Sequence, residues 1–76
     1  MEHCFFIARS LTHAQRMVRT LAQCGVRSSM FRAGASLSKR GCAYAVRLRG
    51  ADAESARRCL ASAGIEPLDV VIRRSE

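Results

Sequence analysis

The second half of this chain repeats the pattern of the first, and this repeat constrains the fold more than any other feature. Residues 58–65 match residues 19–26 when the sequence is shifted by 39 positions, so that Gly64 falls on Gly25. The same shift matches further apolar positions, namely Phe5 with Tyr44, Ile7 with Val46, Ala14 with Ala53 and Phe31 with Val70. Because matches at apolar and glycine positions govern packing, each half is expected to form the same strand–helix–strand unit.

The first half is predicted to contain a strand at residues 4–8, a helix, and a second strand at residues 26–32. Residues 4–8 form a continuous apolar run of strand length. Ser10 or Thr12 can cap the helix, because either hydroxyl can accept a hydrogen bond from a free N–H group of the first turn. Gly25 ends the helix, since glycine adopts the left-handed conformation without steric cost. The helix residues that share one apolar face are Ala14, Met17, Val18 and Leu21.

The second half is predicted to follow the same plan, with strands at residues 43–48 and 68–73. Asp52 is placed to cap the helix between them, and Gly64 is placed to end it. Strand residues alternate between the two faces of a sheet, and an amphipathic helix buries one stripe. The residues predicted to face the core are Tyr44, Val46 and Leu48 in the strand and Ala53, Ala56, Cys59, Leu60 and Ala63 in the helix.

Two such halves in succession predict a βαββαβ chain. This order is typical of the α+β ferredoxin-like sandwich, a four-stranded antiparallel sheet with two helices on one face. A length of 76 residues corresponds to one domain, so residues 1–76 are expected to form a single ferredoxin-like domain. Two helices leave the opposite face of the sheet open, which is compatible with a homodimer in which a second copy covers it.

The charge of the chain is strongly basic, because 13 Lys and Arg residues against 6 Asp and Glu residues give a net charge of +7. Such an excess attracts anions without selecting among them. No stretch approaches the roughly 18 apolar residues of a membrane span, and the first residues lack the layout of a signal peptide. We therefore expect a cytoplasmic protein with no membrane association, whose four cysteines are reduced thiols.

Those cysteines are spread almost evenly along the sequence, at Cys4, Cys24, Cys42 and Cys59. A closed zinc site usually shows close ligand pairs, so neither a metal nor another cofactor is expected. Cys24 and Cys59 lie on or beside the helix stripes and Cys4 begins an apolar strand. These three are expected to be small apolar residues of the structure, because cysteine is among the most buried residue types.

Cys42 differs because it ends the longest segment without apolar periodicity, residues 33–42. Lys39 and Arg40 precede Gly41 and Cys42, and loops of this length in small domains are often functional. Nearby cations stabilise a thiolate over a thiol, and the thiolate is the reactive species. The sequence therefore predicts a functional thiol at Cys42, with Lys39, Arg40 and Gly41 stabilising it or binding an anion.

Short motifs surround this segment in a fixed order. Residues 7–10 (Ile-Ala-Arg-Ser) end the first strand, and residues 25–26 (Gly-Val) end the first helix. Residues 37–38 (Leu-Ser) precede Cys42. The strand predicted after Cys42 contains small and apolar residues around an arginine, and residues 63–65 (Ala-Gly-Ile) end the second helix. In this order the motifs resemble, over nearly the whole chain, a bacterial family of unknown function described as selenium/sulfur carrier-like proteins.

The resemblance implies that Cys42 carries a sulfur or selenium atom as a persulfide or selenyl sulfide. A donor enzyme such as a cysteine desulfurase would load Cys42 and an acceptor enzyme would unload it, so the chain itself would be a carrier and not an enzyme. The segment departs from the family pattern in two places. Members often have proline ahead of the Leu-Ser pair and glycine after the cysteine, whereas residues 33–36 are Ala-Gly-Ala-Ser and Ala43 follows Cys42 here.

The alternative is a small basic interaction or regulatory domain without thiol chemistry, which would bind nucleic acid or a protein partner. Ferredoxin-like RNA readers stack bases on aromatic residues of their central strands. Here Phe5 and Tyr44 share the register predicted for the core, and the glycine-aromatic consensus of such readers is absent, so nucleic acid is not the expected partner. A classical enzyme is not indicated, since the chain has no carboxylate pair, Cys-His dyad or phosphate-binding loop.

Overall fold

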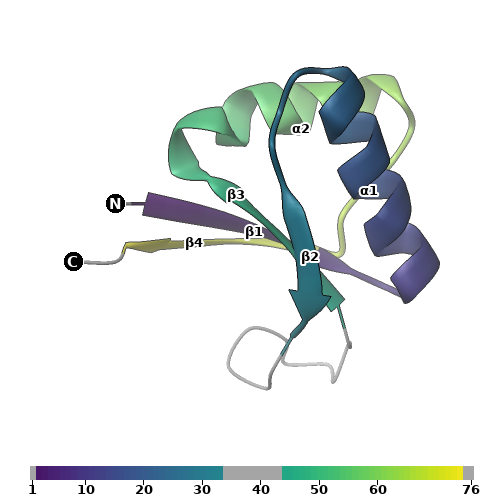
Figure 1. Ribbon diagram of the computed structural model, residues 1–76, viewed down its shortest axis with the longest axis horizontal. Coiled ribbons are helices and arrows are strands. Elements are labelled where there is room, and N and C mark those ends of the chain that lie inside the picture. The colour runs from purple at the N-terminus through teal and green to yellow at the C-terminus, as the bar shows by residue number, and fades with distance from the viewer. Residues whose placement is uncertain (1, 34–43, 75–76) are drawn as a thin grey trace.

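The computed structural model of the chain describes residues 2–33 and 44–74, and the elements follow the order that the repeat predicts (Figure 1). A short 3₁₀ helix, η1, precedes the second α-helix. In chain order the elements are β1 (Glu2–Ala8), α1 (Leu11–Gln23), β2 (Ser29–Arg32), β3 (Tyr44–Arg49), η1 (Gly50–Asp52), α2 (Ala53–Ser62) and β4 (Asp69–Arg74).

Within the described residues, four strands form one antiparallel sheet in the order β2-β3-β1-β4. Both helices lie on the same side of this sheet (Figure 1). β1 is central, because it pairs with β3 on one side and β4 on the other. This arrangement confirms the predicted α+β ferredoxin-like sandwich.

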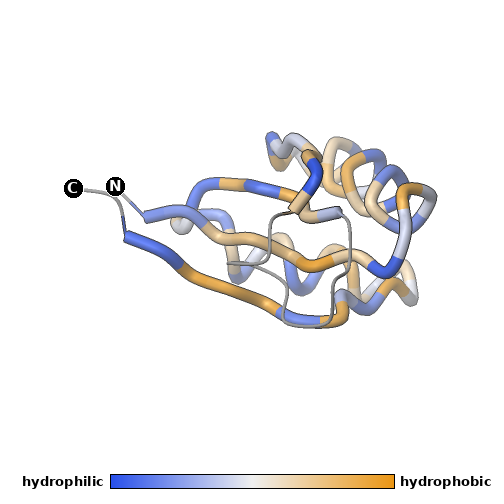
Figure 2. The backbone as a smooth tube through the Cα atoms, turned by 90° about the horizontal axis from the view of Figure 1, so that it is seen from below, coloured by the Kyte–Doolittle hydropathy of each residue, from blue (hydrophilic) through white to orange (hydrophobic). Residues whose placement is uncertain are grey.

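The two ends of the described chain lie side by side, because Glu2 at the start of β1 is in register with Arg74 at the end of β4. Their side chains form an ion pair, with Arg74 Nε 3.7 Å from Glu2 Oε2. Figure 2 shows the two strands running next to each other, with apolar residues in mid-strand and hydrophilic residues toward the termini. β4 is therefore an edge strand of the sheet, on the side of β1 opposite β3.

The core fills the space between the helices and the covered face of the sheet. Cys4, Phe6 and Ala8 alternate onto that face from β1, and all three are fully buried. The predicted faces are confirmed for Val46 and Leu48 of β3, whereas Ala63 is exposed beyond the end of α2. The helix residues that complete the core are Ala14, Met17 and Leu21 of α1 and Ala56, Cys59 and Leu60 of α2.

Each helix ends in the same hydrogen-bonded turn, and the two turns contain the glycines that the 39-residue sequence repeat matches. After α1, Gly25 N–H donates to the Ala22 carbonyl oxygen at 3.1 Å, and Val26 N–H donates to that of Leu21 at 2.9 Å. After α2, Gly64 and the residue following it make the equivalent two bonds at 3.1 and 2.9 Å. The predicted helix stops are confirmed, since the two glycines have φ angles of 77° and 72°.

The structure corrects several predicted boundaries. β2 begins at Ser29 and not at residue 26, because Val26 is buried in the turn that closes α1. Ser10 caps α1 as predicted, its Oγ accepting a hydrogen bond from His13 N–H at 3.1 Å. The Asp52 side chain makes no capping hydrogen bond to α2; its carboxylate lies 3.3 Å from Arg49 Nε instead.

Candidate functional site

The residues predicted to carry function, Lys39, Arg40, Gly41 and Cys42, lie outside the described residues. Their roles therefore remain predictions. The described structure bears on them indirectly, through the state of the other cysteines and through the charges at the end of the sheet where β3 begins.

Cys4 is a free thiol in the core of the sheet. Its side chain is fully buried on β1, in register with Leu48 on one side and Ile72 on the other. Burial raises the pKa of the Cys4 thiol, because a thiolate loses solvation there; the positive charge of Arg57 lowers it without offsetting that effect. Cys4 is thus a protonated, inaccessible thiol near neutral pH, in agreement with its predicted structural role.

Cys24 and Cys59 form a disulfide, which corrects the expectation that all four cysteines are reduced. Cys24 is exposed at the end of α1 and Cys59 is buried on α2, and their Cα atoms are 6.4 Å apart. The pair is 35 positions apart in sequence, so only the packing of α1 beside α2 brings the sulfurs together. Cys59 Sγ also lies 3.4 Å from the Thr20 carbonyl oxygen, to which a reduced thiol would donate a hydrogen bond.

Exposed cations lie at the end of the sheet from which β3 starts. Tyr44, the first residue of β3, is in register with Ala8 of β1 and with Arg32 of β2. Arg9 directly follows β1, and both Arg9 and Arg32 are exposed. The described residues on either side of Tyr44 therefore place positive charge at this end of the sheet.

His13 lies at the start of α1, close to this positive charge. Its Nδ1 accepts a hydrogen bond from Arg9 N–H at 3.0 Å. Burial lowers the pKa of His13, and the cations Arg9 and Arg16 lower it further, while a hydrogen bond with the Glu66 backbone acts in the opposite direction. His13 is therefore neutral near pH 7. A shallow recess of about 410 Å³ lies here, lined by Arg9, Ser10, Thr12, His13, Arg16, Gly64, Ile65 and Glu66.

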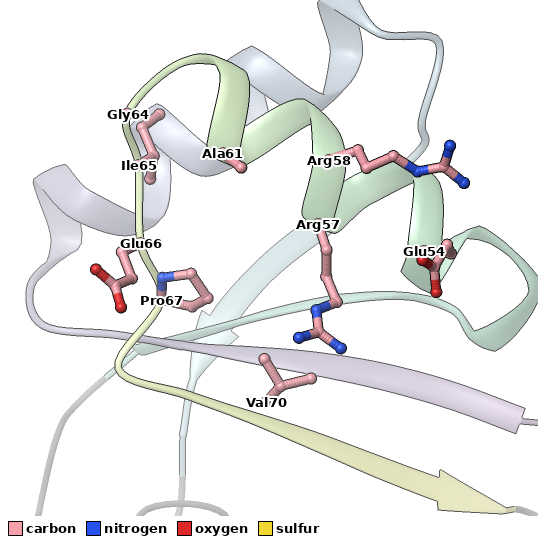
Figure 3. A pocket seen from close by; sticks show the side chains of 9 residues that line it. All are labelled: Glu54, Arg57, Arg58, Ala61, Gly64, Ile65, Glu66, Pro67 and Val70. Atoms are coloured by element: carbon pink, nitrogen blue, oxygen red, sulfur yellow. The ribbon is translucent and has the colours of Figure 1, made fainter.

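A larger groove of about 720 Å³ runs between α2 and the start of β4 (Figure 3). Arg57 extends from α2 toward Val70 of β4, and Glu66 projects from the connection between them (Figure 3). Glu54 and Arg58 add one further charge of each sign to the lining. Because the two signs balance, the groove selects neither anions nor cations.

The face of the sheet opposite the helices carries an aromatic pair that the sequence placed differently. Phe5 was expected in the core register, but Phe6 occupies the core and Phe5 points to the open face. There its ring meets that of Phe31 edge to face, with centroids 5.8 Å apart. A shallow recess of about 370 Å³ is lined by these two rings together with Ser29 and Arg47. Strand alternation could not reveal this, because residues 4–8 are apolar on both faces.

The chain matches no known family model and no curated protein sequence. In the part of the chain that the structure describes, no group of three or more His, Cys, Asp or Glu residues is arranged to hold a metal ion. No helix in residues 2–33 or 44–74 is long and apolar enough to cross a membrane.

Proposed function

We propose that this chain carries sulfur or selenium on Cys42, taking the atom from a donor enzyme such as a cysteine desulfurase and passing it to an acceptor enzyme. The observation that supports this choice is the state of the other cysteines: Cys4 is buried and protonated, and Cys24 is bonded to Cys59. The three cysteines that the structure describes are therefore not free for transfer, which leaves Cys42, the fourth cysteine of the sequence, as the candidate. The resemblance to selenium/sulfur carrier-like proteins points to the same position.

Transfer onto and off Cys42 conserves electrons. The Cys42 thiolate attacks the outer sulfur of a persulfide on the donor; a new S–S bond forms as the donor's S–S bond breaks, and the donor cysteine leaves as a thiolate. A nucleophile of the acceptor then attacks the outer atom of the Cys42 persulfide, and Cys42 leaves as a thiolate. Neither step consumes an oxidant or a reductant, and selenium follows the same course.

Positive charge along the chain supports a thiolate at Cys42. Lys39 and Arg40 precede it in the sequence. Gly41, which separates them from Cys42, is a residue type that permits a tight turn. Two positions after Cys42 the chain enters β3 at Tyr44, in register with the exposed Arg32. Cations near a cysteine lower its pKa, and the thiolate is the form that accepts sulfur.

Intact-mass spectrometry after incubation with a cysteine desulfurase and free cysteine tests the proposal. The wild-type chain should gain the mass of one sulfur atom, and a thiol reductant should remove it. Cys42→Ala should gain nothing, whereas Cys4→Ala should be loaded like the wild type because Cys4 is buried. Equal loading of Cys42→Ala and wild type would refute the proposal. Selenocysteine in place of cysteine tests whether the donor also delivers selenium.

A further inference from the structure

The open face of the sheet contains an accessible aromatic site that the carrier function does not use. Phe5 of β1 and Phe31 of β2 lie on either side of β3, and their rings meet at an interplanar angle of 79°. Phe31 is in register with Ala45, whose small side chain leaves room for the two rings to meet across β3. Ile7 and Ala45 are buried on this face, whereas Phe5 and Phe31 are half-buried and Arg47 is exposed. On the β4 side the same face also carries Asp69, Val71 and Arg73.

One exposed cation stands beside the aromatic pair. Arg47 is in register with Phe5 on one side and with Ser29 on the other, and its side chain is exposed. It forms no ion pair within the described residues, whereas Arg49, the next residue of β3 on the same face, is paired with Asp52. No carboxylate lines the recess formed by Phe5, Ser29, Phe31 and Arg47. The site thus joins two aromatic rings to an unneutralised positive charge.

We infer that this face binds single-stranded nucleic acid, with bases stacking on Phe5 and Phe31 and Arg47 contacting a phosphate. Ferredoxin-like domains that read RNA place aromatic residues on this open face. Stacking on an aromatic ring tolerates any base, and a nearby cation adds affinity for the backbone. The sequence argument against nucleic acid rested on Phe5 and Tyr44 sharing a core register and on the absent glycine-aromatic consensus. The structure removes the first ground for Phe5, whose ring lies on the open face of the sheet.

Charge argues against a second copy of this chain as the occupant. A symmetric dimer brings the same patch of both copies together, so Arg47 of one copy would lie near Arg47 of the other. Each copy also carries a net charge of +7. Like charges placed close together destabilise such a pairing, whereas a polyanion neutralises them.

Fluorescence anisotropy with a labelled single-stranded RNA of about twelve nucleotides, in about 0.15 M salt, tests the inference. Phe31→Leu keeps the apolar bulk but removes the ring, and it should weaken binding about tenfold. Phe31→Tyr keeps a ring and should bind like the wild type. Phe31 is on an edge strand and half-buried, so the test does not depend on a core substitution.

The cation has a matched control. Arg47→Gln and Arg19→Gln remove the same charge, but Arg19 is exposed on α1, away from the open face. Arg47→Gln should weaken binding several-fold and Arg19→Gln should leave it close to wild type. A duplex of the same length should bind more weakly than the single strand, because paired bases are not free to stack.

Four results would overturn the inference. The first is no binding at this salt concentration, and the second is equal loss of binding in Arg47→Gln and Arg19→Gln, which would indicate charge attraction alone. The third is a duplex that binds as tightly as the single strand. The fourth is a dimer in sedimentation experiments that Phe31→Leu dissociates, which would assign the face to a second copy. Loading of Cys42 with sulfur is measured separately and does not depend on any of these outcomes.

Discussion

The sulfur atoms of Cys4 and Cys42 should differ in reactivity, because Cys4 is buried and Cys42 follows two cations in the sequence. Burial raises the pKa of Cys4 and excludes reagents, whereas Lys39 and Arg40 adjoin Cys42 in the sequence. With iodoacetamide at neutral pH, Cys42 should be labelled about tenfold faster than Cys4 or more, as measured by peptide mass spectrometry over time. Its rate against pH should report a pKa below that of a free thiol. Labelling slower than Cys4, or with an ordinary thiol pKa, contradicts the carrier proposal.

Cys4 should also make the fold sensitive to alkali. Its folded-state pKa is raised above the ordinary value of 9.0, so the folded protein keeps a proton that the unfolded chain releases. This stabilising contribution is complete below pH 9.0 and is lost as the pH rises from that value through the folded-state pKa. Urea unfolding of Cys42→Ser, which leaves Cys4 as the one titrating thiol beside the disulfide, should show a falling free energy of unfolding above pH 9.0. When Cys4→Ala is added to Cys42→Ser, the free energy of unfolding should fall less over the same pH range. If the free energy falls equally with pH in the two variants, this explanation is wrong.

The placement of Phe5 and Phe6 shows where prediction from residues reaches its limit. Phe6 and Val46 both face the core, but they are 40 positions apart, while the helices and glycines repeat at 39. The strand repeat is therefore offset by one residue from the helix repeat. A one-residue offset turns every strand side chain to the opposite face, so the match of Phe5 with Tyr44 assigned Phe5 to the core. In an apolar run, only the sheet register resolves this choice.

At the scale of the helices, the Cys24–Cys59 disulfide should stabilise the fold substantially. It closes a loop spanning 35 positions, which corresponds to about 3–4 kcal/mol from the lost entropy of the unfolded chain. Reduction should lower the melting temperature of the wild type but leave that of Cys24→Ala unchanged. Cys24 is exposed, so this variant removes the bond without emptying the core. Thiol titration of the unreduced, denatured protein should detect two thiols, and four after reduction; four before reduction would contradict the disulfide.

The glycine after each helix should be needed for its backbone angle alone. Gly64 has a φ of 72°, and no atom lies within 4 Å of where a Cβ would stand. Gly64→Ala should therefore destabilise the protein by about 1–2 kcal/mol through backbone strain. Gly64→Asn should recover part of this loss, since asparagine tolerates the left-handed region. Gly25→Ala and Gly25→Asn repeat the test at the other helix, because Gly25 has a similar φ angle and also has no atom within 4 Å of where a Cβ would stand. An unchanged urea midpoint in Gly64→Ala would contradict this account.

For the molecule as a whole, the repeat was sufficient to predict the fold but not the chemistry. Glycine stops and apolar spacing predict the order of elements, and the sheet order β2-β3-β1-β4 follows from that order in a ferredoxin-like sandwich. The disulfide could not be predicted, because Cys24 and Cys59 meet only once the two helices pack. The function proposed for Cys42 rests on its sequence neighbours and on the structural states of the other three cysteines.

The net charge of +7 should accelerate loading by a protein donor, because a basic surface steers an acidic partner face toward it. Raising the salt concentration from about 0.05 to 0.2 M should slow sulfur transfer from a desulfurase several-fold, since screening weakens long-range attraction. A small persulfide whose own cationic group balances its negative charge provides the control, because no net attraction steers it and its rate should hardly change. Quenched-flow sampling with intact-mass detection gives both rates. If the two donors respond equally to salt, charge acts on the Cys42 thiolate itself and not on docking, and the basic surface has no part in choosing the partner.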